Sequence, residues 1–192
     1  MKLIAYDSLT ATPWKNGGGI TRELACYPVG ASMSDFIWRV SIADVSASGP
    51  FSSFPGIDRV ITLLDGDGMQ LHFEHGAQRP LVDKLAPYAF RGEDKVDAQL
   101  IGSPSRDFNL MTRRNVAHGK VEVRRTAGVI DLRLSSSLLF CAHGEWQTSV
   151  AEQPLQQGDT LMIDARDGDA IITPKNADSA LLCVRITMVS GH

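Results

Sequence analysis

The feature of this sequence that most constrains its fold is a series of short runs in which apolar and polar residues alternate. The runs are separated by Gly, Pro, Asn and Asp, which is the pattern of strands joined by turns. In residues 36–43, for example, Phe36, Trp38, Val40 and Ile42 fall on one face of a predicted strand. No stretch longer than about ten residues keeps a clean helical period with caps. The sequence therefore predicts a mostly β protein.

One strand pair is predicted around the turn residues 65–68, which read Asp-Gly-Asp-Gly. Residues 59–64 and 69–73 flank this turn, and strands joined by an Asp-Gly turn commonly form a β-hairpin. Residues 49–56 are rich in Gly and Pro and are predicted to be a loop. Residues 107–113 alternate again and are predicted to form a further strand.

The two halves of the chain resemble each other in the order of their predicted elements. Each half has a strand, a glycine turn and further strands, and each closes with an apolar strand, at 108–112 and at 180–187. This order is typical of a small jelly roll, in which antiparallel sheets cover each other's edges. We therefore predict two jelly-roll β-barrels in one chain, the first over residues 1–118 and the second over 119–192.

Composition excludes several classes of partner. The 192 residues include 19 Lys and Arg against 22 Asp and Glu, and the basic pairs at 113–114 and 124–125 make no stripe for nucleic acid. No apolar run approaches the roughly 20 residues of a membrane-spanning helix, and the start turns polar too early for a signal peptide. Three widely spaced cysteines fit neither a disulfide framework nor a zinc knuckle. We expect a cytoplasmic protein that binds neither nucleic acid nor membranes.

Four motifs in the first part of the chain occur together, in the same order, in one protein family. They are PWKNGGGITRE at 13–23, WRVSIA at 38–43, FSSFPGIDR at 51–59 and DFNLMTR at 107–113. With these motifs the chain resembles the HutD/Ves family of cupin-like proteins. The resemblance implies a bicupin fold, and an association with histidine utilisation or, in the Ves branch, with the stress response. It implies no particular reaction.

A metal site is the first question for a cupin-like chain. Metal-binding cupins hold their ion with two histidines one residue apart on a strand, a glutamate shortly after, and a histidine from a later strand. Here the corresponding strand, residues 69–75, should turn its apolar residues into the barrel and leave His72 and Glu74 outside. A later strand offers Tyr88 and Phe90 where the third ligand would lie. We therefore expect no metal and no other cofactor.

The glycine-rich segment at residues 14–19 is the most unusual composition in the chain. It matches neither the P-loop nor the dinucleotide-binding fingerprint. Consecutive glycines nevertheless let a backbone approach a ligand closely, and turned N–H groups can hold an anion. A plain flexible turn is the alternative from composition alone, whereas the family resemblance favours a functional segment.

Polar strand faces supply the other candidates. Arg39 and Ser41 share one face, and Asp107, Asn109 and Arg113 share another. Polar residues on the outer face of a sheet are ordinary, so this pattern alone leaves the choice open. If the faces line a barrel mouth, arginine forks can bind a carboxylate and aromatic rings can wall a flat ligand. The predicted ligand-binding residues are Trp14, Lys15, Asn16, Gly17, Thr21, Arg39, Ser41, Phe54, Phe90, Asp107, Asn109 and Arg113.

The neighbouring pair Asp58 and Arg59 is predicted to be an internal ion pair that braces the loop after the Pro-Gly turn. The cysteines have no adjacent histidine, so we expect no nucleophilic role for them.

Two functions from different classes follow. We favour a metal-free binding protein for a small carboxylate metabolite, namely an intermediate of histidine breakdown, with a regulatory role and a regulatory protein as an optional partner. The alternative is a cofactor-independent hydrolase or isomerase on the same metabolite, with Glu23 or Asp107 as general base and Lys15 or Arg113 stabilising negative charge. A scaffold whose motifs only serve folding is a third option. The protein is expected to be a monomer or a homodimer.

Overall fold

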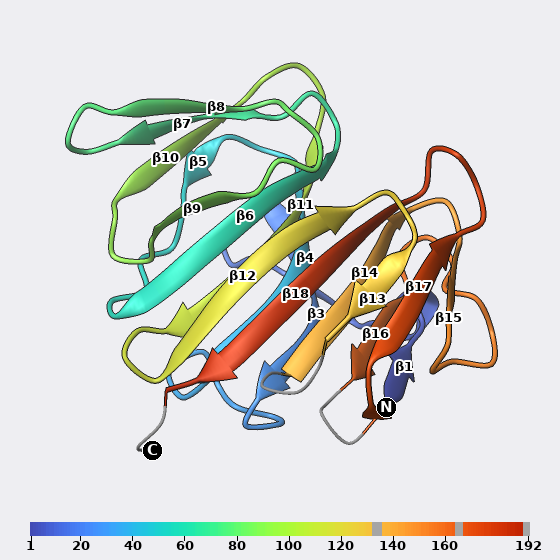
Figure 1. Ribbon diagram of the computed structural model, residues 1–192. Coiled ribbons are helices and arrows are strands. Elements are labelled where there is room, and N and C mark those ends of the chain that lie inside the picture. Colours follow the sequence, from blue (N-terminus) through green and yellow to red (C-terminus); the bar gives the residue numbers. More distant parts are fainter. Residues whose placement is uncertain (132–135, 164–166, 190–192) are drawn as a thin grey trace. The chain divides into compact units, whose positions relative to one another are not determined.

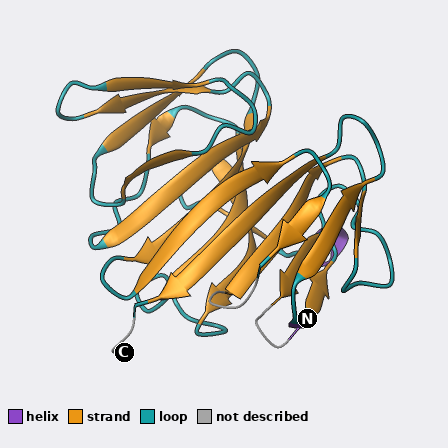
Figure 2. Cartoon of the chain, viewed as in Figure 1, coloured by secondary structure: helices purple, strands orange, loops and turns teal. Residues whose placement is uncertain are grey.

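The computed structural model of the protein describes residues 1–131, 136–163 and 167–189 and consists mainly of strands (Figures 1 and 2). The prediction of a mostly β protein is confirmed. The described elements are β1 (Lys2–Ile4), η1 (Tyr6–Ser8), β2 (Ala11–Pro13), β3 (Gly19–Tyr27), β4 (Trp38–Val45), β5 (Gly49–Pro50), β6 (Ile57–Asp65), β7 (Met69–Phe73), β8 (Gln78–Leu81), β9 (Tyr88–Arg91), β10 (Val96–Leu100), β11 (Ser105–Arg113), β12 (Ala117–Arg124), β13 (Gly128–Ile130), β14 (Ser136–His143), β15 (Trp146–Thr148), β16 (Thr160–Ile163), β17 (Ala170–Pro174) and β18 (Ala180–Met188). Within these described residues, no helix is long and apolar enough to cross a membrane.

The chain divides into two compact units. The N-terminal unit is Thr10–Ala117, and the C-terminal unit combines Met1–Leu9 with His118–His192. The predicted division at residue 118 assigns the first nine residues to the N-terminal barrel. In the structure they belong to the C-terminal unit, because β1 pairs with β16 and so joins the sheet of that unit.

The N-terminal unit is built from two antiparallel sheets. One has six strands in the order β2-β3-β4-β11-β6-β9, and the other has four in the order β5-β10-β7-β8. A core lies on their facing sides and includes Ile61 and Leu63 from β6 with Met69 and Leu71 from β7, all at most 1% exposed. Because side chains alternate along a strand, the residues two positions away from these core residues face the same interior.

The predicted hairpin around Gly66 and Gly68 is wrong, since β6 and β7 belong to different sheets and do not pair. Both glycines have a positive φ, 91° and 88°, which glycine adopts without a steric cost. They also pack against backbone: a Cβ on Gly66 would lie 2.3 Å from the carbonyl oxygen of Pro104, and one on Gly68 would lie 2.1 Å from that of Leu81. The turn therefore carries the chain from one sheet to the other around a tightly packed corner.

The C-terminal unit repeats this plan with fewer strands. Its larger sheet has the order β1-β16-β14-β18-β12, and its smaller sheet has the order β13-β17-β15. The core on their facing sides is apolar and includes Leu139 and Cys141 from β14, Leu181 and Cys183 from β18, and Trp146. The three cysteines of the chain are all free and buried.

Candidate functional site

Polar side chains gather on the interior face of the six-stranded sheet of the N-terminal unit. The register of the strands places them in three neighbouring rows: Arg39, Met111, Arg59 and Phe90; then Glu23, Ser41, Asn109, Ile61 and Tyr88; then Thr21, Ala43, Asp107 and Leu63. The rows contain the core residues Ala43, Ile61 and Leu63, so their polar members share the interior face. We call Thr21, Glu23, Arg39, Ser41, Arg59, Asp107 and Asn109 the polar cluster.

Arg59 is the most unusual member of the polar cluster, because a guanidinium is rarely buried without a carboxylate partner. The residue is only 7% exposed. Its Nη2 donates a hydrogen bond to the amide oxygen of Asn109 over 3.1 Å, while its Nε is buried and has no partner. Burial lowers the pKa of Arg59 to about 10, so the side chain remains a cation at neutral pH.

Three phenyl rings surround the Arg59 guanidinium. Its Cζ lies 4.8 Å from the ring centre of Phe90, 5.2 Å from that of Phe51 and 5.7 Å from that of Phe54. Ring faces attract a cation, but they leave the N–H groups at its edge without acceptors. The predicted aromatic residues Phe54 and Phe90 are thus brought to the cluster, around an arginine that the prediction did not include.

Asp107 is the deepest acid of the polar cluster and is 1% exposed. Its Oδ1 is buried without a hydrogen-bond partner. Burial raises the pKa of Asp107 to about 7, although the charge of Arg59 acts in the opposite direction. Near neutral pH a fraction of the molecules therefore has Asp107 protonated and the rest has it ionised. On average, the negative charge of Asp107 neutralises only part of the positive charge of Arg59.

The polar cluster reaches solvent at Glu23. The Nε of Arg39 donates to Oε2 of Glu23 over 2.8 Å, and its Nη1 donates to the hydroxyl of Ser41 over 3.2 Å. The Arg39 side chain is 12% exposed and that of Glu23 41%. Polar groups therefore run from the surface at Glu23 to the interior at Asp107, and four predicted residues, Arg39, Ser41, Asp107 and Asn109, lie along this path with Glu23.

The glycine-rich segment forms the turn between β2 and β3. The indole Nε1 of Trp14 donates to the hydroxyl of Thr21 over 2.7 Å, which ties the turn to the polar cluster. The amide of Gly17 donates to the carbonyl of Trp14 and that of Gly18 to Oδ1 of Asn16, so these N–H groups are used within the turn itself. Lys15, Asn16 and Gly17 are exposed. The structure thus brings Trp14 and Thr21 to the cluster and leaves the three residues of the turn at the surface.

Gly19 explains why this segment requires glycine. A Cβ at this position would lie 2.5 Å from the carbonyl oxygen of Asp44 and 3.2 Å from the ring of Trp14. The close approach seats the indole against the backbone of β3.

Arg113 lies at the end of β11 and holds a loop. Its Nε donates to the carbonyl of Phe36 over 3.1 Å and its Nη2 to the carbonyl of Ser34 over 2.8 Å. These bonds join β11 to the segment before β4, so two of its three guanidinium nitrogens are already occupied.

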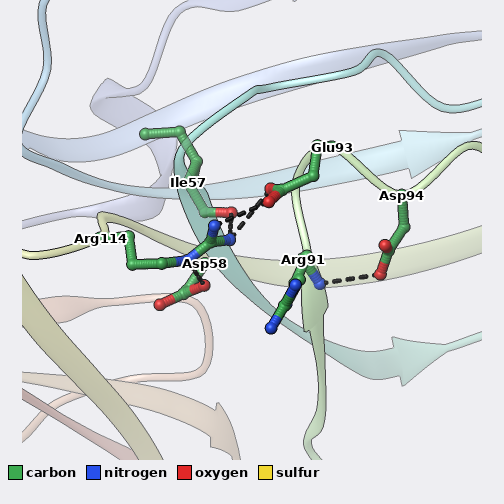
Figure 3. Close-up of polar contacts among 6 residues, drawn as sticks. All are labelled: Ile57, Asp58, Arg91, Glu93, Asp94 and Arg114. Atoms are coloured by element: carbon green, nitrogen blue, oxygen red, sulfur yellow. Dashed lines mark hydrogen bonds and ion pairs between the residues drawn. The ribbon is translucent and has the colours of Figure 1, made fainter.

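The predicted ion pair between Asp58 and Arg59 is wrong, because neighbouring residues of a strand point to opposite faces. Asp58 instead accepts a hydrogen bond from the Nε of Arg114 over 2.8 Å (Figure 3). The Nη1 and Nη2 of Arg114 bind the two carboxylate oxygens of Glu93 at 2.7 and 2.9 Å (Figure 3). This fork holds the turn after β9 against the start of β6, next to Arg59.

The interior of this unit does not fit a metal ion. Met69, Leu71 and Phe73 of β7 face the core, as the alternation predicts, and Glu74 forms an ion pair with Lys95. Among the described residues, no group of three or more His, Cys, Asp and Glu side chains is arranged to hold a metal.

Sequence comparisons give relatives along most of the chain. Residues 6–182 match the family model described as HutD. An uncharacterised 21.2 kDa protein encoded in the hutC 3′ region of Pseudomonas putida is 35% identical over 170 residues, which are 87% of this chain and 88% of that protein. Protein Ves of Escherichia fergusonii is 42% identical over 136 residues, 70% of this chain and 69% of that protein.

Solved structures show the same fold. HutD from Pseudomonas fluorescens, solved in a formate condition, superimposes with a TM-score of 0.86 and 33% identity, over 98% of this chain and 99% of that one. An oxalate decarboxylase from Lactobacillus farciminis, solved as a formate complex, has a TM-score of 0.63 at 9% identity over 96% of this chain and 85% of that one, which supports a cupin-type fold alone. On the extent of the family match and of these relatives, the chain belongs to the HutD family.

Proposed function

We propose that the protein binds a small carboxylate metabolite at the polar cluster of the N-terminal unit. The single observation that carries this proposal is the buried cation of Arg59, whose Nε has no partner and whose Nη2 donates its hydrogen bond to the uncharged amide of Asn109. A buried charge is costly unless it is paired, and arginine binds a carboxylate through two parallel hydrogen bonds. A carboxylate ligand would supply both the missing charge and the missing acceptor.

The rest of the cluster suits an acid that also has a planar polar group. The rings of Phe51, Phe54 and Phe90 surround the guanidinium and offer flat apolar faces. Asn109 and Ser41 lie in the next row, where an amide and a hydroxyl can orient a neutral nitrogen or oxygen.

The relatives support the choice of a histidine-breakdown intermediate. Two of them carry a hut designation, which associates them with histidine utilisation. The structure of HutD from P. fluorescens was solved in a formate condition, and formate is the smallest carboxylate. We propose that occupancy of the cluster reports the level of the metabolite and so regulates its use.

The test is a thermal-shift panel with urocanate, formiminoglutamate, formylglutamate, histidine and unrelated dicarboxylates, each with and without EDTA. A ligand at 100 times its Kd adds about 2.7 kcal/mol to stability, which raises Tm by roughly 5–10 °C in a chain of this size. We expect a selective shift for one histidine-pathway acid, unchanged by EDTA. A panel in which no acid raises Tm would refute the proposal.

Two arginine variants locate the binding. Arg59→Gln should abolish the shift, since it removes the buried cation. Arg91→Gln, an exposed neighbour on β9, should leave the shift intact and controls for the loss of an arginine. A shift that survives Arg59→Gln would place the ligand elsewhere.

The enzyme alternative has one observation in its favour, which is the carboxyl of Asp107. Its pKa of about 7 would let it take up or release a proton at neutral pH. The acid that shifts Tm should therefore be incubated with protein and followed by NMR for product, with Asp107→Asn as the control. Turnover that Asp107→Asn abolishes would assign an activity, whereas binding without product leaves the protein a binding module.

A further inference from the structure

The C-terminal unit carries a second group of polar side chains on the interior face of its larger sheet. Arg185 of β18 is the register partner of Ser137 of β14, and Ser137 is in turn the partner of Ile163. Cys183 and Ile163 belong to the core of this unit. Because Arg185 lies two residues beyond Cys183, the two side chains share the interior face.

Two residues of the neighbouring strand β12 join this group. Arg124 donates through its Nη2 to Oε2 of Glu122 over 2.9 Å, and both residues occupy one face of β12. The charges of Arg124, Glu122 and Arg185 all act on the pKa of the Cys183 thiol, which burial raises to about 12. The side chains of Glu122, Arg124, Cys183 and Arg185 are therefore neighbours.

The group occupies the place that the polar cluster has in the N-terminal unit. The strand order β12-β18-β14 corresponds to β4-β11-β6 (Figure 1). Ser137 lies seven residues before the turn at Gly144, as Arg59 lies seven residues before the turn at Gly66. The two units thus place polar residues at the same row of the equivalent sheet, although the residue types differ.

Three polar atoms of this group are buried without a nitrogen or oxygen partner: the Nε of Arg124, the Nε of Arg185 and the hydroxyl of Ser137. The guanidinium of Arg124 also lies against the thiol of Cys183, which is at most a weak acceptor. Buried polar atoms are normally satisfied by protein, water or a ligand. All three can donate a hydrogen bond, and donors are what an oxyanion needs.

The charges of the group also favour an anion. Both carboxylate oxygens of Glu122 are occupied, one by Lys120 at 2.8 Å and the other by Arg124 at 2.9 Å. Among the described residues, the carboxylate whose charge interacts with Arg185 is that of Glu122, and its ion pairs are with Lys120 and Arg124 and not with Arg185. Because Lys120 is exposed to solvent, the charges inside the group are the guanidinium groups of Arg124 and Arg185 and the single carboxylate of Glu122, which leaves an excess of positive charge.

We propose that Arg124, Arg185 and Ser137 form a second anion site, which binds a small oxyanion independently of the polar cluster. The two guanidinium groups supply N–H donors and charge, and the hydroxyl of Ser137 supplies a third donor. A carboxylate of an organic acid and an inorganic phosphate share the chemistry that this site recognises.

The test follows the Nε–Hε signals of the arginines by NMR while sodium acetate or sodium phosphate is added at constant ionic strength. Arg124→Lys, Arg185→Lys and Arg125→Lys assign the signals, and the exposed Arg125 serves as the control. We expect the signals of Arg124 and Arg185 to shift along one saturable curve while that of Arg125 does not. Ser137→Ala, checked for its fold by its amide spectrum, should weaken the binding at least threefold.

The two anions and one further variant complete the design. Saturation by acetate alone assigns an organic acid, saturation by phosphate alone assigns a phosphate, and saturation by both assigns a general oxyanion site. The titration is repeated in Arg59→Gln, where the shifts should persist because the sites are separate. Shifts that vanish in this variant, that grow linearly without saturation, or that match those of Arg125 would overturn the proposal.

Discussion

Replacement of the buried acid of the polar cluster should change the way that stability depends on pH. In the folded protein the pKa of Asp107 rises from 3.8 to about 7, mainly through burial. Below pH 3.8 the carboxyl is neutral in both the folded and the unfolded chain, so burial carries no ionic cost. As the pH rises from about 4 to 7, the unfolded chain ionises first, and the folded protein loses stability. Asp107→Asn cannot ionise and should escape this loss.

The size of the effect follows from linkage. Each unit of pKa difference corresponds to about 1.36 kcal/mol, so the difference between 3.8 and about 7 gives about 4 kcal/mol. The free energy of unfolding of Asp107→Asn, relative to the natural protein, should therefore rise by about 4 kcal/mol between pH 4 and pH 8. In a chain of this length the change amounts to roughly 10 °C in Tm.

The assay is urea unfolding of both proteins at several values between pH 4 and pH 8, in buffers without carboxylates. Asp97→Asn is the matched control, since Asp97 is exposed on β10. Its difference from the natural protein should show no such rise. If the Asp107→Asn difference is flat or falls with pH, then Asp107 is charged in the folded protein and pairs with Arg59, and the reasoning is refuted.

Three further predictions concern other parts of the fold. Gly19→Ala should lower stability by about 1–3 kcal/mol in urea unfolding because its Cβ would overlap backbone, whereas Gly49→Ala, with nothing within 4 Å, should cost far less. The hydrogen bond from Arg114 is the main reason that the pKa of Glu93 lies at about 2, so in Arg114→Gln an NMR titration should find this pKa closer to 4.5. The stability that the hydrogen bond adds is present above pH 4.5 and is lost as the pH falls toward 2. An unchanged pKa of Glu93 in the variant would contradict the assignment. Cys183, whose pKa burial raises to about 12, should resist alkylation at pH 8 until the chain is unfolded, and rapid labelling of the folded protein would count against its burial.

Alternation along single strands was the most reliable guide from the sequence. It predicted correctly that Met69, Leu71 and Phe73 face the core of the N-terminal unit, because an apolar stripe with period two has one way to bury itself. It could not predict which strands pair: β6 and β7 are adjacent in the chain, but a turn built from two glycines separates them into different sheets.

Arg59 shows how a site residue was missed although its signal was present. It alternates with Ile61 and Leu63, which are 1% and 0% exposed, so the period alone places it inside. Its neighbour Asp58 suggested an ion pair, and a buried arginine is uncommon enough that the pair was the simpler interpretation. Arg113 could not be placed from the sequence at all, since its partners are carbonyls of residues 34 and 36, far away along the chain.

The pairing of β1 with β16 has a consequence for the order of events during synthesis. The ribosome releases residues 2–4 well before the strand that they join, Thr160–Ile163, which emerges more than 150 residues later. At 5–20 residues per second this is a delay of roughly 10–30 s, during which the N-terminal unit, continuous over Thr10–Ala117, can close. A nascent chain therefore keeps residues 2–4 unpaired until β16 has emerged. Loss of that segment would leave β16 as an uncovered edge, open to pairing with other molecules.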